Sequence, residues 1–300
     1  MFNYFENFMS VIVTSFFARR VASVPKGLVF CAVLSLAFGG VALAASSGQS
    51  PWMDQTNSKV RLVSGTLNSD DSAAIYAGVQ LRMEPGWKTY WRNPGDSGVP
   101  PRFDWSGSKN LKSAEVLYPA PHRFADAGGV AIGYKNDVVF PVKITPERSG
   151  EPVKLALSFD YGLCKDLCIP NEVTLGVALP PNLGRGDARL LKTALDRVPE
   201  PAQADTLPRI ARITAKLDGP TPTLEVEALF PSGATGTDLF VESPEVIVPV
   251  PKVLGPMKGG KQRFTVTFYS PAEAAAIKGK TLTFTLVSNE GSTDTKWTTE

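Results

Sequence analysis

Histidine and cysteine are scarce in this chain, and their scarcity excludes most active-site chemistries. Its 300 residues include one histidine, His122, and three cysteines. A zinc site built on several histidines is therefore impossible, and a Ser–His–Asp triad would have to use His122, which no serine motif accompanies. The chain also lacks a glycine-rich phosphate loop ending in Lys-Ser/Thr and the G-x-S-x-G nucleophile motif.

The first 44 residues have the pattern of an export signal. Three basic residues, the last of them Lys26, precede an uncharged apolar stretch over 27–43, and an A-x-A cleavage signal ends at Ala44. The apolar stretch is short and rich in small residues, which favours cleavage over retention as a membrane anchor. We therefore predict a signal peptide over 1–44.

Export also removes the surplus of positive charge. Residues 1–44 hold three basic residues and one acidic residue, so the 31 basic and 29 acidic residues of the chain become 28 of each. A neutral protein gives no electrostatic reason to expect nucleic acid or an anionic membrane surface as a partner. No later run is apolar for long enough to cross a membrane. Cys31 leaves with the signal, so the mature protein keeps Cys164 and Cys168 in an oxidising compartment.

Short runs of strand character fill most of the mature chain and predict an all-β, or mainly β, fold class. After a polar lead over 45–57, alternating apolar and polar residues recur between turn signals, in keeping with 25 prolines and 26 glycines. This spacing is typical of a sandwich or barrel, which we place at 58–182. The runs lie at 59–67, 73–83, 88–93, 138–144, 153–161 and 172–179.

A helix and a linker, together 183–208, separate this block from a second one. Asp187 is positioned to cap the helix, which ends before Pro199, and a stretch rich in Pro and Ala follows. The apolar face of the helix comprises Leu190, Leu191, Ala194, Leu195 and Val198. Residues 209–300 predict a second, smaller β-sandwich, with runs at 210–217, 223–230, 239–241, 246–250, 263–269 and 281–287.

The two remaining cysteines have three residues between them and lie between two strand-like runs. Gly162 before them and Pro170 after them bracket a tight connection, which can bring both into disulfide range. A structural bridge is one interpretation, but a loop of this length adds only about 2 kcal/mol through chain entropy. Thiol–disulfide exchange is the other. Lys165 favours a thiolate at Cys164, and Asp166 opposes it.

Two segments rich in rings and turn residues are candidates to cover the pair. The first is 87–98, and the second is the loop 118–129, which leads to Gly133-Tyr134. In one interpretation the rings fill the core and the prolines and glycines make turns. In the other, the rings wall the cysteines and the second loop forms a lid over them.

Five segments in this order resemble a known family. They read W-K-T-Y-W-R-N-P-G-D-S-G-x-P-P (87–101), Y-P-x-P-x-R-F (118–124), G-Y (133–134), V-x-F-P-V (138–142) and Y-x-x-C-x-x-x-C-x-P (161–170). Together they are similar to the N-terminal periplasmic domain of DsbD-type thiol–disulfide interchange proteins. They most resemble the ScsB-type branch associated with copper tolerance. The resemblance covers about 58–182 and extends, less distinctively, into the second block.

The resemblance implies an immunoglobulin-like sandwich in the periplasm that carries a redox-active cysteine pair and needs no cofactor. In the family this domain takes electrons from a thioredoxin-like domain, passes them to periplasmic acceptors, and protects its cysteines with a mobile cap loop. By position, Cys164 and Cys168 match the redox pair, with Cys168 as the more exposed sulfur that links to partners. Matched to the cap or its shielding groups are Tyr90, Trp91, Phe124, Asp126, Tyr134 and Tyr161.

Two departures from the family pattern affect this expectation. The spacing of the cysteines is shorter than in the best-known DsbD proteins. The sequence also stops at Glu300, without the family's transmembrane electron-conducting segment and C-terminal thioredoxin-like domain. For a complete chain, a separate membrane electron conductor would have to reduce the protein.

We therefore expect a periplasmic thiol–disulfide exchange protein, of the protein-disulfide reductase type if it acts as an enzyme, with thioredoxin-like partners. Two alternatives stay open. One is a copper(I)-binding module in which Cys164, Cys168 and His122, or a methionine such as Met83 or Met257, supply the ligands. The other is a non-catalytic interaction protein with a structural disulfide.

Overall fold

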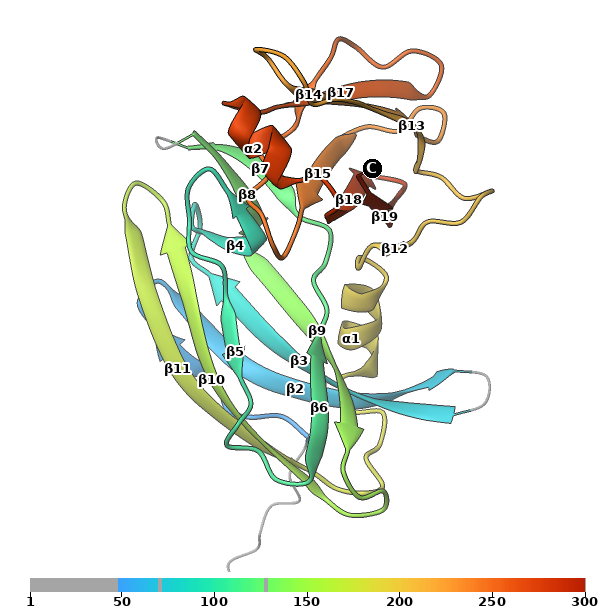
Figure 1. Cartoon of the computed structure of the whole chain (residues 1–300). Coiled ribbons are helices and arrows are strands. Elements are labelled where there is room, and N and C mark those ends of the chain that lie inside the picture. The colour runs from blue at the N-terminus through green and yellow to red at the C-terminus, as the bar shows by residue number, and fades with distance from the viewer. Residues whose placement is uncertain (1–47, 70–71, 127–128, 300) are drawn as a thin grey trace, which may run out of the picture. The chain divides into compact units, whose positions relative to one another are not determined.

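The computed structural model describes residues 48–69, 72–126 and 129–299 (Figure 1). The predicted signal peptide and Cys31 lie outside these residues. The described part is mainly β, as predicted, and is built of several sheets that are consistent with immunoglobulin-like sandwiches. Within it, no helix combines the length and the apolar character needed to cross a membrane.

Two sheets form the first sandwich. One has the order β1-β2-β3-β9-β6, and the other has the order β11-β10-β4-β8-β7, with the short strand β5 paired to β10. The first comprises β1 (Met53–Gln55), β2 (Ser58–Ser69), β3 (Ser72–Met83), β9 (Asp137–Pro146) and β6 (Leu111–Val116). The second comprises β11 (Cys168–Leu179), β10 (Val153–Cys164), β4 (Lys88–Gly95), β8 (Gly129–Lys135), β7 (His122–Asp126) and β5 (Arg102–Asp104).

Alternation along the strands builds the core between these sheets. In β11 every second residue from Asn171 to Leu179 is buried, and β10 alternates in the same way over its first nine residues. At the centre, the ring of Phe140 is fully buried and lies 5.4–6.4 Å, between ring centroids, from four other rings. These are Phe103, Tyr118, Tyr134 and Phe159.

The segment 118–129, predicted to be a loop, is partly strand. His122–Asp126 forms β7, which pairs with β8 in a hairpin. In this hairpin His122 lies opposite Gly133. Its polar and small residues do not alternate with apolar ones over enough positions to signal a strand. The hairpin adds an edge to the sheet that carries the cysteines, so the candidate lid is continuous with that sheet.

The predicted helix is present as α1 (Ala188–Leu195), which packs on β2, β3 and β9 with Leu191 and Ala194 buried. A Cβ at Gly78 would lie 2.8 Å from Leu191 Cδ2, so glycine in β3 permits this close approach. Asp187 occupies the N-cap position, but its side chain makes no capping bond. It instead accepts a 2.6 Å hydrogen bond from Gln49 Nε2, which ties the polar lead to the helix.

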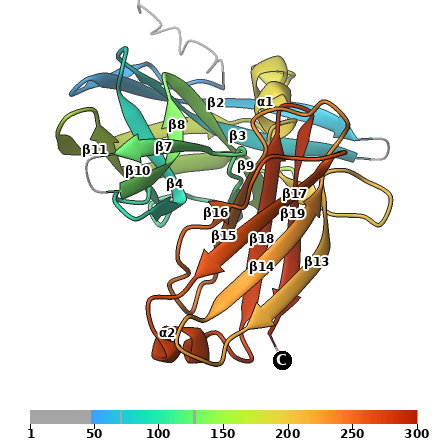
Figure 2. The same cartoon turned by 90° about the horizontal axis from the view of Figure 1, so that it is seen from above.

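The second sandwich, defined here as residues 200–299, packs two four-stranded sheets (Figure 2). Their orders are β12-β19-β18-β15 and β13-β14-β17-β16. The first comprises β12 (Glu200–Pro201), β19 (Gly291–Thr298), β18 (Thr281–Ser288) and β15 (Asp238–Glu242). The second comprises β13 (Arg209–Lys216), β14 (Thr223–Leu229), β17 (Lys261–Thr267) and β16 (Lys252–Val253).

Three details of this block differ from expectation. The predicted linker contributes β12, which pairs in parallel with β19. The run 246–250 is not a strand, and its Ile247 is 95% exposed. A second helix, α2 (Pro271–Ala276), was not predicted. It starts with Ser270-Pro-Ala-Glu273, in which the Ser270 hydroxyl accepts from the Glu273 amide, so a capping box with Pro at N1 was the available signal.

The buried aromatic centre predicts a sharp difference between two substitutions. Replacing Phe140 with Ala is expected to lower the free energy of unfolding by about 3–5 kcal/mol, because it removes a large ring from a closed core. Ile247→Ala, at an exposed position, is expected to stay within about 0.5 kcal/mol of the parent protein. Urea unfolding followed by tryptophan fluorescence measures both, and equal effects would contradict the assignment of the core.

Candidate redox site

The cysteine pair closes a long β-hairpin. Strand β10 ends at Cys164 and β11 begins at Cys168, and the two are directly opposite each other in the last pair of a twelve-pair antiparallel ladder. Their Cα atoms are 4.1 Å apart, and the sulfurs are joined as a disulfide. The ladder thus fixes both cysteines in register, and the three residues between them form the turn.

The two sulfurs differ in their access to solvent. Cys164 is 3% exposed, whereas Cys168 lies among the exposed residues of the turn. Leu167, between them, is 72% exposed and marks the tip of the hairpin. A thiolate from another protein can therefore reach Cys168 Sγ, with Cys164 as the leaving group behind it.

Aromatic rings cover the inner sulfur. Tyr90, Ala131 and Cys164 form a separate buried cluster, against which Phe124 packs. The Tyr90 hydroxyl lies 3.3 Å from Cys168 Sγ and donates to it, because a disulfide sulfur carries no hydrogen. Gly98 has a φ of +135°, and a Cβ there would lie 2.3 Å from the Tyr90 ring, so glycine lets the chain cross that ring closely.

The other residues that the family resemblance assigns to the cap or its shielding groups lie elsewhere in the first sandwich. Trp91, next to Tyr90, faces the core and is fully buried. Tyr134 donates a 2.8 Å bond to the carbonyl of Pro119, and burial raises its pKa well above the usual value. Tyr161 lies 2.8 Å from the Ser58 hydroxyl, and burial raises its pKa to about 12. Asp126 ends β7, where its backbone pairs with Gly129.

Two lysines are in register with the inner cysteine. Cross-strand pairing sets Cys168, Cys164, Lys88 and Lys135 in one row over β11, β10, β4 and β8. Directly paired residues in a sheet project to the same face, so the side chains of Cys164, Lys88 and Lys135 leave the sheet on one side. Lys88 is 8% exposed, and the Nζ of Lys135 lies 4.5 Å from the centre of the Phe124 ring. Sequence analysis did not find Lys88, because the register that pairs it with Cys164 cannot be seen from spacing.

His122 begins β7, and its ring centroid lies 6.4 Å from that of Phe124. Loss of hydration and the nearby Arg197 charge lower its pKa. Within the described residues, no three His, Cys, Asp or Glu side chains gather in an arrangement suited to a metal ion.

Comparisons with known proteins agree with this geometry. Residues 65–179 match the family model described as "Thiol:disulfide interchange protein DsbD, N-terminal". A search of curated proteins gave no match. Among solved structures, the chain is similar in fold to the N-terminal periplasmic domain of ScsB from Proteus mirabilis. That match has a TM-score of 0.65 and 21% identity, and it covers 84% of this chain and 98% of the other.

The matched segment starts in β2 and ends at the last residue of β11, so it contains the cysteine hairpin and the rings over it. The ScsB structure extends the similarity over most of the chain, including much of the second sandwich. Both findings agree with the resemblance drawn from the motifs. Residues 65–179 therefore form a domain of the DsbD N-terminal type, and the chain is similar in fold to the ScsB periplasmic domain.

Proposed function

We propose that the protein is a periplasmic thiol–disulfide exchange protein that passes reducing equivalents between thioredoxin-like partners. One observation carries the proposal: the disulfide at the hairpin tip joins an exposed cysteine to a buried cysteine that is packed in an aromatic cluster. A structural disulfide does not require this difference in exposure. A disulfide that exchanges with a partner requires one cysteine that the partner's thiolate can reach and one that is protected.

The exchange step follows from the burial of the two sulfurs. A partner thiolate attacks Cys168 Sγ, the Cys164–Cys168 bond breaks, and Cys164 leaves as a thiolate. The partner's second thiolate then attacks its own sulfur in the mixed disulfide, which releases an oxidised partner and the reduced pair. Two electrons have moved to this protein. Reduction of an acceptor disulfide runs through the same kind of intermediate, with Cys168 attacking and Cys164 resolving.

Apolar surface next to the outer sulfur gives a partner a contact area. Leu167 is 72% exposed and Val99 is 59% exposed. A Cβ at Gly162 would lie 3.5 Å from Val99 Cβ, which places Val99 over the end of β10. The buried centre of a protein–protein interface is typically apolar, so this surface suits contact with a partner protein.

The reduction potential of the pair tests the proposal directly. Equilibration of the mature protein with glutathione or thioredoxin buffers, followed by thiol alkylation, is expected to give a value above about −300 mV, in the range of exchange proteins. A potential well below that would assign the disulfide a structural role and reject the proposal.

Single-cysteine variants test the order of attack. Cys164→Ser is expected to form a mixed disulfide with an activated single-cysteine thioredoxin, because its remaining Cys168 is exposed. Cys168→Ser, which keeps only the buried sulfur, is expected to react much more slowly. Gel analysis without reductant measures both. Equal trapping would contradict the assigned order, and full multi-turnover reduction by either variant would contradict a dithiol mechanism.

The lysine row predicts an electrostatic contribution to the leaving group. With Lys88→Met, reduction of the disulfide by thioredoxin is expected to slow several-fold, because a buried Cys164 thiolate loses its cross-strand cation. Ultraviolet absorbance of the thiolate in a Cys168→Ser background is expected to fall at pH 7.5. The matched control is Lys143→Met, at an exposed position in the other sheet. Equal rates in the two variants would remove Lys88 from the mechanism.

A further inference from the structure

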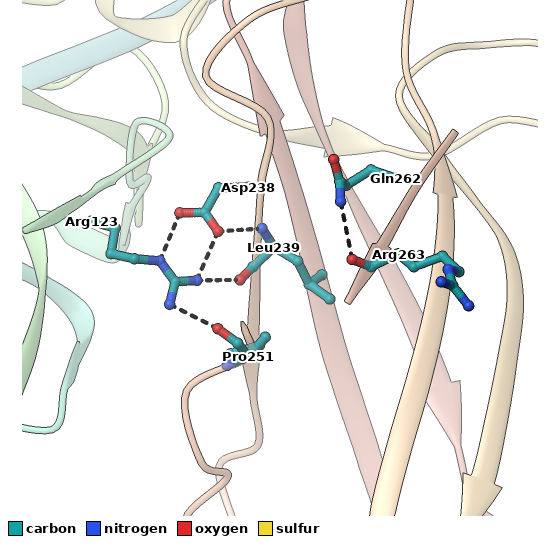
Figure 3. Close-up of polar contacts among 6 residues, drawn as sticks. All are labelled: Arg123, Asp238, Leu239, Pro251, Gln262 and Arg263. Atoms are coloured by element: carbon teal, nitrogen blue, oxygen red, sulfur yellow. Dashed lines mark hydrogen bonds and ion pairs between the residues drawn. The ribbon is translucent and has the colours of Figure 1, made fainter. Parts of the chain in front are cut away.

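Strand β7 is fastened to the second sandwich by one arginine (Figure 3). Arg123 Nε and Nη2 donate to the two carboxylate oxygens of Asp238 at 2.9 and 2.7 Å. Its Nη1 donates to the carbonyl of Pro251 at 2.8 Å, and Nη2 also reaches the carbonyl of Leu239 at 3.2 Å. The guanidinium carbon lies 5.6 Å from the centre of the Phe240 ring. Charge, planarity and several acceptors together specify arginine here.

Phe124, the residue after Arg123, packs at the cysteine site. Successive side chains on a strand point to opposite faces, so Arg123 and Phe124 leave β7 on opposite sides. Arg123 bonds to Asp238 of the second sandwich, while Phe124 packs against the cluster of Tyr90, Ala131 and Cys164. The position of the Phe124 ring against the cluster that contains Cys164 is therefore tied to a hydrogen-bond network in the second sandwich.

Strand β4 repeats this arrangement. Tyr90 points to the disulfide, and the next residue, Trp91, has its ring centroid 5.7 Å from that of Phe240. Arg92 then donates from Nε to Glu242 at 2.6 Å, and its Nη2 lies 3.5 Å from Asp294 Oδ2. Both strands that carry rings to the disulfide are thus anchored in the second sandwich immediately beside those rings.

One strand of the second sandwich receives most of these contacts. All five residues of β15, Asp238–Glu242, take part, through a side chain, a ring or a carbonyl oxygen. Val241 takes part through its carbonyl, which accepts a 3.3 Å bond from Asn93 Nδ2. Since β15 is the end strand of its sheet, its free side lies against the first sandwich.

We propose that the second sandwich is a positioning element for the redox site. Through the Arg123–Asp238 pair it holds β7 and its Phe124 ring against the cluster that contains Cys164, so that small thiols reach the disulfide only from its Cys168 side. Arg123 is in this sense a positioning residue and takes no part in the exchange itself. The inference rests on the proposed function, but the access of small thiols to the disulfide can be measured separately from it.

The test is the rate at which reduced glutathione attacks the disulfide of the mature, full-length protein. Arg123→Met and Asp238→Asn are each expected to raise this rate about threefold or more, because β7 opens more often. The double variant is expected to add little to either single one, since both break the same pair. Arg148→Met is the matched control, because Arg148 pairs with Glu151 on the surface at 2.9 Å.

Circular dichroism and the urea midpoint of each variant show whether it is folded. If Arg123→Met does not fold, the rate of Asp238→Asn decides, because asparagine has nearly the same shape as aspartate. Unchanged rates in a folded Asp238→Asn protein would overturn the inference, as would an equal rise in Arg148→Met. Failure of the proposed function is distinguishable, because it appears in the reduction potential and in partner trapping. The glutathione rate reports only access to the sulfur.

Discussion

The antiparallel ladder between β10 and β11 is the constraint on which the site depends. Twelve consecutive pairs hold the two strands in one register, and the last pair is the disulfide. A slip by one residue would exchange the buried and solvent-facing sides of both strands, so the core residues that fix the register also fix the sulfurs. The same ladder brings Cys164 beside Lys88 of β4. Packing far from the turn thus determines the local chemistry at its tip.

Burial then divides the work between the two cysteines. The strand end keeps Cys164 beneath Tyr90 and Phe124, while the turn carries Cys168 into solvent. A disulfide placed in the middle of either sheet would be closed to a partner on both sides, and one in a free loop would be open on both. The end of a hairpin is the place where one sulfur can be shielded by neighbouring strands while the other is not.

Local patterns were enough to predict the main strands, α1 and the cysteine pair, because alternation, helical spacing and the Cys-x3-Cys motif are each contained in a short stretch of chain. Predictions failed where a local pattern misleads or is missing. The run 246–250 is apolar but forms no strand, and β7 lacks alternation of apolar and polar residues. Long-range features left no local signal: Arg123 and Asp238 are 115 positions apart, and the pairing of Lys88 with Cys164 depends on register.

The contacts made by β15 have a consequence for the second sandwich by itself. An end strand carries carbonyl and amide groups that an extended segment of another molecule can use as a template. Here the carbonyls of Leu239 and Val241 accept from Arg123 and Asn93, so side chains of the first sandwich occupy positions that an added strand would need. Separated from its neighbour, the second sandwich would present a bare edge to other copies of itself. The tandem arrangement therefore also protects the chain from edge-to-edge association, the first step toward β-type aggregation.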